Sequence, residues 1–395
     1  ILKQLKEIQD ALQAADLDGW LLYDFRGLNP IAVRLAGLPP EGHFSRRWAY
    51  WIPAQGQPAW LLHRIEMGPF LNRPERLVPY VSWQELRQGL RSLLGDARRI
   101  AMEYSPQNAI PYVSRVDAGT IELLRSLGYE VVSSADLVQL VEARWTPAQL
   151  AQHRETADQL NQIKDECFAW LSRELQAGRT PGEVEGQQFV MRRFAELDLV
   201  TDHPPIVGVN QHSGDPHYAP TLERQFMVKP GDFVLLDLWA KPNRPDAVFA
   251  DITWTAVAAA QPTARQQEIF GIVARARDAA VHFIQQRVTA GEPIRGYEVD
   301  DACRGVIAAA GYGPQFIHRT GHSIDTSTHG NGVNIDNLET EDRRHLIPGI
   351  AFSIEPGIYL PDFGVRSEID VYVGEGSAEV TTQPVQQTIV PLLPA

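Results

Sequence analysis

The segments FVLLDLWA (residues 233–240) and VFADITWTAV (residues 248–257) each place a carboxylate inside an apolar strand pattern, at Asp237 and Asp251. Aspartate and glutamate are depleted from strands and are almost never fully buried unless they are paired or coordinated. Burial of an unpaired carboxylate costs several kcal/mol or forces its protonation. The two segments therefore indicate strands whose acidic residues have a specific partner.

The same anomaly recurs near the end of the chain, in IAFSIEPGIYL (residues 350–360) around Glu355 and in FGVRSEIDVYV (residues 363–373) around Glu368. A single acid of this kind can belong to a solvated strand face, but four acids in separate apolar strands need a common cationic partner. Arg366 is the only basic residue in a comparable strand position. A divalent metal is therefore the simplest partner for the four carboxylates.

The histidines are concentrated in the same part of the chain. Eight of the eleven follow residue 200, and three lie within HRTGHSIDTSTH (residues 318–329), as His318, His322 and His329. A lone histidine is more often a surface or core residue, but three within a stretch rich in Gly, Ser and Thr favour a shared site. One imidazole with several carboxylates suits Mn, or alternatively Co or Zn, in a site where carboxylates bridge two ions.

The pattern of elements predicts two domains. Helical and extended segments alternate over residues 1–145, which predicts an α/β domain. Thr146, Pro147 and Gln149 then provide a helix N-cap, a proline for the first turn and a capping-box residue, so a long helix should begin there. Apolar strands after about residue 205, accompanied by helical stretches, predict an α+β domain over residues 146–395 with a curved antiparallel sheet.

The composition limits the possible partners of the chain. Among 395 residues, 49 are acidic and 36 are basic, and the lysines and arginines are scattered, so nucleic-acid and anionic-membrane partners are not expected. No apolar run approaches the roughly 20 residues that a membrane helix needs. The first residues, ILKQLKEIQDALQ, show an amphipathic helix pattern without a secretory signal, and two cysteines cannot form a disulfide framework. We therefore expect a cytoplasmic protein.

The order Asp, Asp, His, Glu, Glu, with HRTGH ending at His322 and SIEPG around Glu355, resembles metallopeptidase family M24. The resemblance is closest to the proline-specific branch, the Xaa-Pro dipeptidases (prolidases) and Xaa-Pro aminopeptidases, in which an α/β domain precedes the catalytic domain. It implies a creatinase-like domain over residues 1–145 and a pita-bread (creatinase/aminopeptidase-like) catalytic domain over residues 146–395.

The resemblance further implies a dinuclear metal site with five ligands: Asp237, Asp251, His322, Glu355 and Glu368. Asp251 and Glu368 would bridge the two ions, and a metal-bound hydroxide would attack the scissile carbonyl. Glu355 would relay the proton to the proline nitrogen. This transfer is needed because the Xaa-Pro bond is a tertiary amide, whose leaving nitrogen must be protonated as it departs.

Contacts with the substrate are implied by the resemblance for six further residues: His217, His318, His329, Tyr359, Arg366 and Asp370. His217 would contact the substrate, and His318 and His329 would polarise the carbonyl or stabilise the tetrahedral intermediate. Arg366 has two possible roles at this point. It can receive the C-terminal carboxylate of a dipeptide through paired hydrogen bonds, or it can form a salt bridge to Asp370, which lies on the same face of the strand.

The expected activity is hydrolysis of Xaa-Pro dipeptides, small peptides with proline at the second position, by an enzyme that family analogy makes a homodimer. Alternatives are an Xaa-Pro aminopeptidase acting on longer peptides, a creatinase-type hydrolase and a non-catalytic peptide-binding relative. One departure from the family affects the substrate pocket: after His322 the family often has glycine-rich sequence, whereas this chain has Ser-Ile-Asp-Thr-Ser-Thr.

Overall fold

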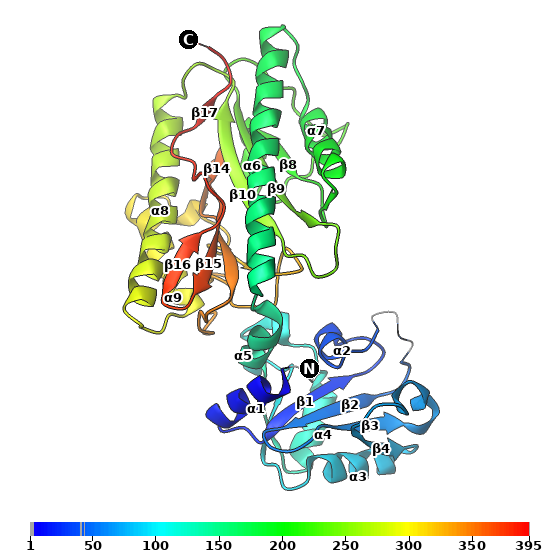
Figure 1. Ribbon diagram of the computed structural model, residues 1–395. Coiled ribbons are helices and arrows are strands. Elements are labelled where there is room, and N and C mark those ends of the chain that lie inside the picture. The colour runs from blue at the N-terminus through cyan, green and yellow to red at the C-terminus, as the bar shows by residue number, and fades with distance from the viewer. Residues whose placement is uncertain (1–3, 40–41, 43, 395) are drawn as a thin grey trace. The chain divides into compact units, whose positions relative to one another are not determined.

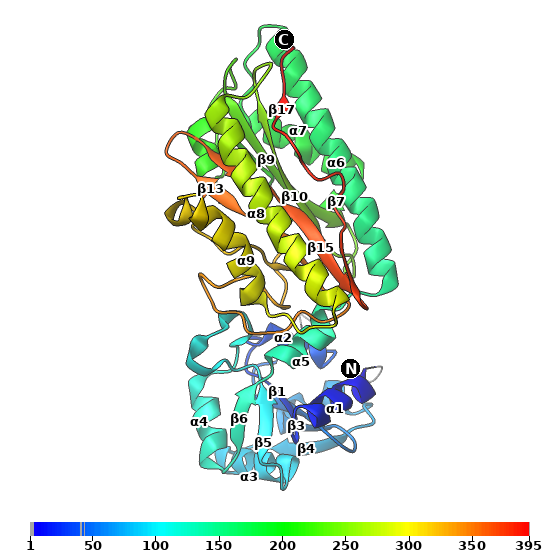
Figure 2. The ribbon, with the colours of Figure 1, turned by 90° about the vertical axis from the view of Figure 1, so that its left-hand side faces the viewer.

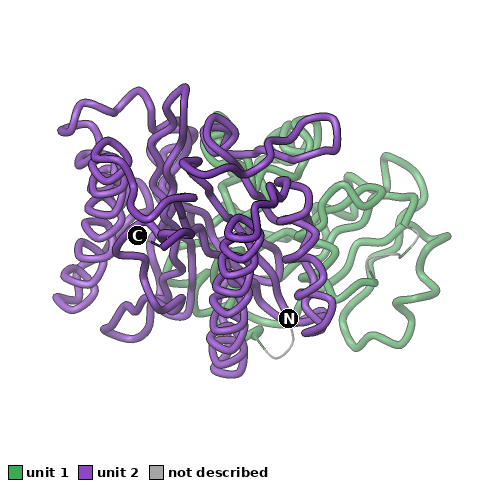
Figure 3. Tube along the Cα trace, turned by 90° about the horizontal axis from the view of Figure 1, so that it is seen from above, with its two compact units in different colours: residues 1–142 green, residues 143–395 purple. Residues whose placement is uncertain are grey.

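The computed structural model describes residues 4–39, 42 and 44–394 and divides into two compact units (Figure 3). Unit 1 comprises residues 1–142 and unit 2 comprises residues 143–395. The sequence pattern had placed a boundary between residues 145 and 146, at the cap of the long helix. Ala143 is fully buried in a core cluster of unit 2, so the packing of this unit begins before its first long helix.

Unit 1 is a six-stranded mixed sheet in the order β4-β3-β2-β1-β5-β6 (Figures 1 and 2). Its strands are β1 (Gly19–Asp24), β2 (Trp48–Pro53), β3 (Ala59–His63), β4 (Arg76–Tyr80), β5 (Arg99–Met102) and β6 (Glu130–Ser133). Its α-helices are α1 (Leu5–Ala14), α2 (Pro30–Leu35), α3 (Trp83–Leu94), α4 (Ala118–Ser126) and α5 (Ala135–Val138).

Alternation along β1 places helices on both faces of this sheet. Trp20 and Leu22 belong to one apolar cluster, which includes residues of α1 and α2. Leu21 and Tyr23 belong to a second cluster, which includes residues of α3 and α4. Because successive side chains of a strand point to opposite faces, the sheet is covered by one helical layer on each side. The predicted α/β character is confirmed.

Unit 2 combines long helices with short antiparallel sheets (Figure 1). Its helices are α6 (Pro147–Gln176), α7 (Glu183–Glu196), α8 (Ala264–Thr289) and α9 (Gly296–Ala309). Its strands are β7 (Leu199–Val200), β8 (Ile206–Val209), β9 (Phe233–Pro242), β10 (Ala250–Val257), β11 (Ser323–Ile324), β12 (Ala351–Ile354), β13 (Gly357–Tyr359), β14 (Gly364–Arg366), β15 (Ile369–Gly374), β16 (Ser377–Val380) and β17 (Val390–Pro391).

The strands of unit 2 form three sheets that are joined at the centre of the unit. One contains β17-β10-β9-β7 with β8 also paired to β9, a second contains β11-β12-β15-β16, and a third contains β13-β14. An isolated antiparallel bridge between Thr253 and Glu368 connects β10 to the segment between β14 and β15. Within the described part of unit 2, all strand pairings are antiparallel except that of β10 with β17, which confirms the predicted α+β class.

The start of α6 follows the predicted signal. The Thr146 hydroxyl accepts a hydrogen bond from the backbone N–H of Gln149, and the Gln149 side chain accepts one from the backbone N–H of Thr146. This capping box satisfies two donors that the first helical turn would otherwise leave unpaired. In the part of the chain that the structure describes, no helix combines the length and the apolar character that crossing a membrane requires.

The two faces of the β9–β10 hairpin have different roles. Leu236, Leu238 and Ile252 face an apolar cluster that includes residues of α6 and α7. Asp237 and Asp251 alternate with these residues and therefore point to the opposite face. On that side β12, β14 and β15 contribute to another apolar cluster, with α8 and α9. The acidic side chains thus lie in the interior of unit 2, between these two apolar clusters.

Candidate metal centre

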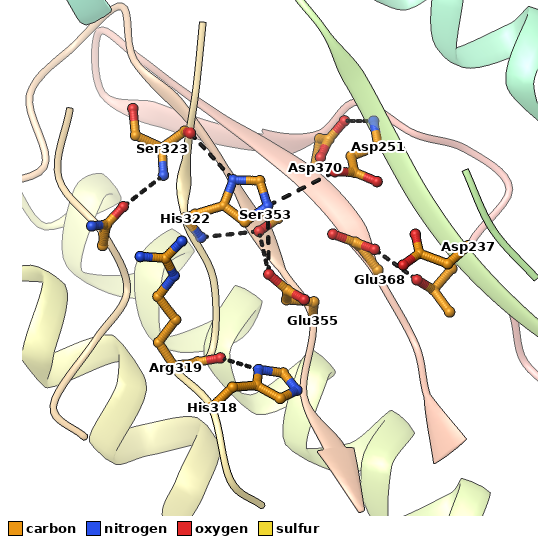
Figure 4. A network of polar contacts seen from close by, with 12 residues as sticks. Asp237, Asp251, His318, Arg319, His322, Ser323, Ser353, Glu355, Glu368 and Asp370 are labelled. Carbon is orange, nitrogen blue, oxygen red and sulfur yellow. Dashed lines mark hydrogen bonds and ion pairs between the residues drawn. The ribbon is translucent and has the colours of Figure 1, made fainter. Parts of the chain in front are cut away.

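Three predicted ligand residues converge in the interior of unit 2. Asp251 lies on β10, His322 immediately precedes β11, and Glu368 lies between β14 and β15. One potential ligand atom from each of them lies within 4.8 Å of the other two, and all three residues are buried. Figure 4 shows the side chains pointing toward one another from three separate segments of the unit.

Asp237 and Glu355 complete the group of five predicted ligands. Asp237 lies on β9 directly opposite Thr253, whose hydroxyl donates a 2.7 Å hydrogen bond to the Glu368 carboxylate. Glu355 follows β12, and its Oε1 lies 3.5 Å from Nε2 of His322. The same Nε2 lies 3.8 Å from Oδ2 of Asp251. The structure therefore brings the five side chains together around a small volume (Figure 4).

The buried carboxylates of this group need additional positive charge nearby if they are to be ionised. Burial raises the pKa of Asp251 well above its usual range, and the neighbouring charges of Glu368 and Asp237 raise it further. Burial and then the charge of Glu355 raise the pKa of Glu368 in the same way. The Oδ1 atoms of Asp237 and Asp251 are buried and have no hydrogen-bond partner among the residues that the structure describes. Hard divalent cations, which prefer carboxylate oxygens, fit this donor set.

Arg366 is a cation that directly contacts the group. Its guanidinium forms an ion pair with Asp237 and donates to the Tyr359 hydroxyl oxygen at 3.1 Å and to the Thr253 hydroxyl oxygen at 3.2 Å. Among the described residues its ion pair is with Asp237, and not with Asp370 as strand alternation had suggested. The carboxylate of Asp237, on β9, lies nearer to the guanidinium than that of Asp370 does. The local sequence around Arg366 does not reveal this neighbour.

The imidazole of His322 is oriented for metal binding. Its Nδ1 lies 3.2 Å from the carbonyl oxygen of Ser323, so Nδ1–H donates to that oxygen and Nε2 faces Asp251 and Glu355. Burial lowers the pKa of His322 well below its usual value, and the neighbouring His329 lowers it further. The ring is therefore neutral, which is the state that ligates metals.

The other three predicted histidines lie in different surroundings. The His329 ring packs edge-on against His322, with 4.3 Å between the centroids, and burial lowers its pKa to about 4. Nε2 of His318 lies 2.6 Å from the Tyr359 hydroxyl oxygen and its Nδ1 lies 2.7 Å from the Arg319 carbonyl oxygen. His217 is exposed.

Asp300 and Asp370 support the centre through contacts that local sequence patterns did not identify. Asp300, buried on α9, accepts the backbone N–H of Thr320 at 3.0 Å and two hydrogen bonds from Arg304, which also donates to the His318 carbonyl oxygen. Asp370 had been associated with the substrate, but its Oδ2 accepts the backbone N–H of Asp251 at 2.9 Å. Such long-range partners leave no periodic signal in a sequence.

A neighbour of Asp370 was also missed. His153 on α6 is fully buried, with Nδ1 2.8 Å from the Phe249 carbonyl oxygen and Nε2 2.7 Å from the Thr381 hydroxyl oxygen. The same Nε2 lies 3.7 Å from Oδ2 of Asp370. Burial lowers the pKa of His153 to about 4, so this imidazole is neutral at physiological pH. It packs behind the carboxylates as a structural support of the centre.

Antiparallel sheets covered by long helices, with a buried set of carboxylates and one imidazole between them, define a metal-dependent enzyme domain. The model of Metallopeptidase family M24 matches residues 155–375, which is 375 − 155 + 1 = 221 of the 395 residues. The chain therefore belongs to metallopeptidase family M24. Members of this family use divalent metal ions, in agreement with the chemistry of the donor set.

Individual relatives agree with this assignment. The chain is 27% identical to the probable dipeptidase PepE of Mycobacterium tuberculosis over 359 residues, covering 88% of this chain and 87% of that protein. It is 32% identical to an Xaa-Pro dipeptidase of Lactobacillus helveticus over 195 residues, 49% of this chain and 48% of that protein. The crystal structure of dipeptidase PepE from Mycobacterium ulcerans superposes with a TM-score of 0.71 at 23% identity, covering 99% of this chain and 98% of that chain.

Proposed function

We propose that the protein is an Xaa-Pro dipeptidase that uses two divalent metal ions, with manganese preferred. The observation that carries this proposal is the convergence of five buried ligand candidates, Asp237, Asp251, His322, Glu355 and Glu368. The names of the relatives support the substrate class, since one is an Xaa-Pro dipeptidase and another a probable dipeptidase. Four carboxylates with one imidazole favour a hard ion such as manganese.

The same five residues would hold the two ions. When bound, two divalent ions lower the pKa of water and polarise the scissile carbonyl. The unpartnered Oδ1 atoms of Asp237 and Asp251 are available as ligands without loss of a protein hydrogen bond. His322 presents Nε2, because its Nδ1–H is held by the Ser323 carbonyl.

Glu355 is the residue we assign to proton transfer. Its side chain is 15% exposed, against 10% for Asp237 and 5% for Asp251, so it is the most accessible of these three carboxylates. Burial raises its pKa to about 7, which suits a group that takes and returns a proton near neutral pH. In this role Glu355 accepts a proton from the attacking water and delivers it to the departing proline nitrogen.

The surrounding histidines divide between support and substrate contact. His318 donates Nδ1–H to a carbonyl and accepts from the Tyr359 hydroxyl, so both of its nitrogens are engaged with the protein. His329 lies against His322, and the exposed His217 is among the neighbours that lower the pKa of His329. We therefore assign contact with the substrate carbonyl to His329 and His217, and the orientation of Tyr359 to His318.

The test compares Ala-Pro, Ala-Pro-Ala and creatine as substrates of protein that has been stripped with a chelator and reloaded with Mn²⁺. We expect Ala-Pro to be cleaved fastest, and only by the reloaded protein. His322→Ala should remove Mn²⁺ binding, and Glu355→Gln should lower kcat by about 100-fold or more. The matched controls, His282→Ala and Glu268→Gln, change exposed residues of α8 and should retain activity.

Each other outcome has a defined meaning. Faster cleavage of Ala-Pro-Ala than of Ala-Pro would make the protein an aminopeptidase, and turnover of creatine alone would make it a creatinase-type hydrolase. Undiminished Xaa-Pro cleavage in excess chelator, or none with Mn²⁺, Co²⁺ or Zn²⁺, would overturn the proposal. A protein that binds the dipeptide without cleaving it would be a non-catalytic relative.

A further inference from the structure

Trp239 stands beside two proposed metal ligands. It follows Asp237 by two positions on β9, so the two side chains share a face of the strand. In the register of the β9–β10 ladder, Trp239 lies directly opposite Asp251. Directly opposite residues of an antiparallel pair have Cβ atoms about 4.5–5.5 Å apart. The indole therefore adjoins the carboxylate of Asp251 on the face that carries the metal centre.

The indole is held in place from two sides. It packs against Ile206, Tyr218 and Leu235 in one apolar cluster, and it also packs against a second cluster that includes Phe249 and Ile324. Its Nε1–H donates a 2.7 Å hydrogen bond to Oδ1 of Asp202, in the segment between β7 and β8. Because its only polar atom is engaged, the side chain presents an apolar surface of fixed orientation.

The proposed reaction indicates which half of the substrate Trp239 would contact. Under the proposed function, Glu355 delivers a proton to the proline nitrogen, so the proline lies on the Glu355 side of the centre. The residue before proline is attached to the opposite side of the scissile carbonyl. It therefore extends away from Glu355, and Trp239 stands opposite Asp251, another of the proposed ligands. The indole is partly buried, so part of its surface remains accessible.

We propose that Trp239 forms the wall of the subsite that receives the side chain of the residue before proline. This inference rests on the proposed function and specifies its substrate class. Apolar side chains such as that of leucine gain contact with the indole and with the apolar residues around it, whereas glycine has no side chain to contribute. The protein is accordingly a dipeptidase for dipeptides with an apolar residue before proline.

The experiment measures kcat/KM for Leu-Pro and for Gly-Pro in Mn²⁺-loaded protein, and the readout is the ratio of the two. Any general loss of catalysis cancels in this ratio, because both substrates use the same metal centre. Wild-type protein should favour Leu-Pro, and Trp239→Ala should lower the ratio by about tenfold. Trp239→Phe keeps an apolar ring without the hydrogen bond to Asp202, so it should retain most of the preference for Leu-Pro over Gly-Pro.

Folding of each variant is checked by its melting temperature, because Trp239 also packs in two apolar clusters. If Trp239→Ala does not fold, Trp239→Phe is compared with Trp239→Gln. Glutamine fills the space with a polar amide, so Trp239→Gln should lose the preference for Leu-Pro over Gly-Pro. An unchanged ratio, or one that rises when the indole is removed, would overturn the inference while the dipeptidase activity stands. Failure of wild-type protein to cleave either substrate would overturn both proposals.

Discussion

The backbone N–H of Asp251 donates a 2.9 Å hydrogen bond to Oδ2 of Asp370, which belongs to a different strand and lies 119 positions later in the chain. Asp370 is fully buried, and its backbone N–H donates in turn to the Thr382 hydroxyl oxygen at 2.8 Å. The contact thereby ties β10, which carries Asp251, to β15, which begins directly after Glu368. The position of the Asp251 carboxylate depends on this contact as well as on the β9–β10 ladder.

Removal of the Asp370 acceptor should weaken metal binding. Asp370→Ala leaves the Asp251 N–H buried without a partner, and loss of such an outer contact typically lowers metal affinity about 10- to 100-fold. Titration calorimetry with Mn²⁺ measures the effect. Asp370→Asn keeps an acceptor oxygen and should bind Mn²⁺ more tightly than the alanine variant. The exposed Glu375, in the turn after β15, provides the control Glu375→Gln. Equal Mn²⁺ affinity in Asp370→Ala and wild-type protein would contradict this role.

The acidic strand residues could be predicted from the sequence because they violate two local rules at once. Asp237 and Asp251 interrupt apolar runs, and the period of two fixes which face each of them occupies. The strands themselves and the capped start of α6 could also be predicted from the sequence, because apolar periodicity and capping residues are local signals. These features determined the α+β class of unit 2.

The contacts that complete the centre depend on which strands become neighbours, and no local pattern contains that information. Arg366 pairs with Asp237 because β14 lies beside the β9–β10 hairpin, whereas alternation along its own strand pointed to Asp370. His153 and Asp300 support the centre from helices, and in the sequence they look like ordinary helical positions. Their importance follows only from complete burial and from partners far away in the chain.

Metal-free protein should become less stable as the pH rises. The pKa values of Asp251 and Glu368 are raised in the folded state, chiefly by burial, from ordinary values of 3.8 and 4.5. Above these values the folded protein therefore holds more protons than the unfolded chain does. The free energy of unfolding then falls as the pH rises toward the folded-state pKa values. Bound cations compensate the carboxylate charges and should reduce this dependence.

Melting temperatures measured from about pH 5 to about pH 8, in chelator and in Mn²⁺, test this prediction. We expect the melting temperature in chelator to fall across the range, and Mn²⁺ to raise it most at the alkaline end. His322→Ala should lose the response to Mn²⁺. A metal-free protein whose stability increases over this pH range would show that the carboxylates are compensated in some other way.

Glu103 makes unit 1 sensitive to pH independently of the metal. It is fully buried and accepts hydrogen bonds from Trp20 at 2.6 Å, Asn29 at 2.7 Å and Ser134 at 3.0 Å. Burial nevertheless raises its pKa from 4.5 to about 7. Between these two values the folded state holds the extra proton, so the free energy of unfolding should fall by about 3 kcal/mol as the pH rises through this range.

Urea unfolding of wild-type protein and of Glu103→Gln at about pH 5 and about pH 7.5 measures this contribution. Glutamine cannot titrate, so the variant should show a weaker pH dependence for the transition of unit 1. Glu122→Gln, which changes an exposed residue of α4, should behave like wild-type protein. The same pH dependence in Glu103→Gln and in wild-type protein would mean that Glu103 remains ionised in the folded state.

Tyr359 connects the histidine side of the site to Arg366. Its hydroxyl accepts from Nη1 of Arg366 at 3.1 Å and lies 2.6 Å from Nε2 of His318, to which it donates. Tyr359→Phe removes both hydrogen bonds, but it leaves the ion pair of Arg366 with Asp237. We therefore expect kcat/KM for Ala-Pro to fall about tenfold, which corresponds to about 1.4 kcal/mol and lies within the range for loss of two modest hydrogen bonds, while Mn²⁺ affinity stays unchanged. Parallel loss of both quantities would show instead that Tyr359 acts on the metal ligands through Arg366.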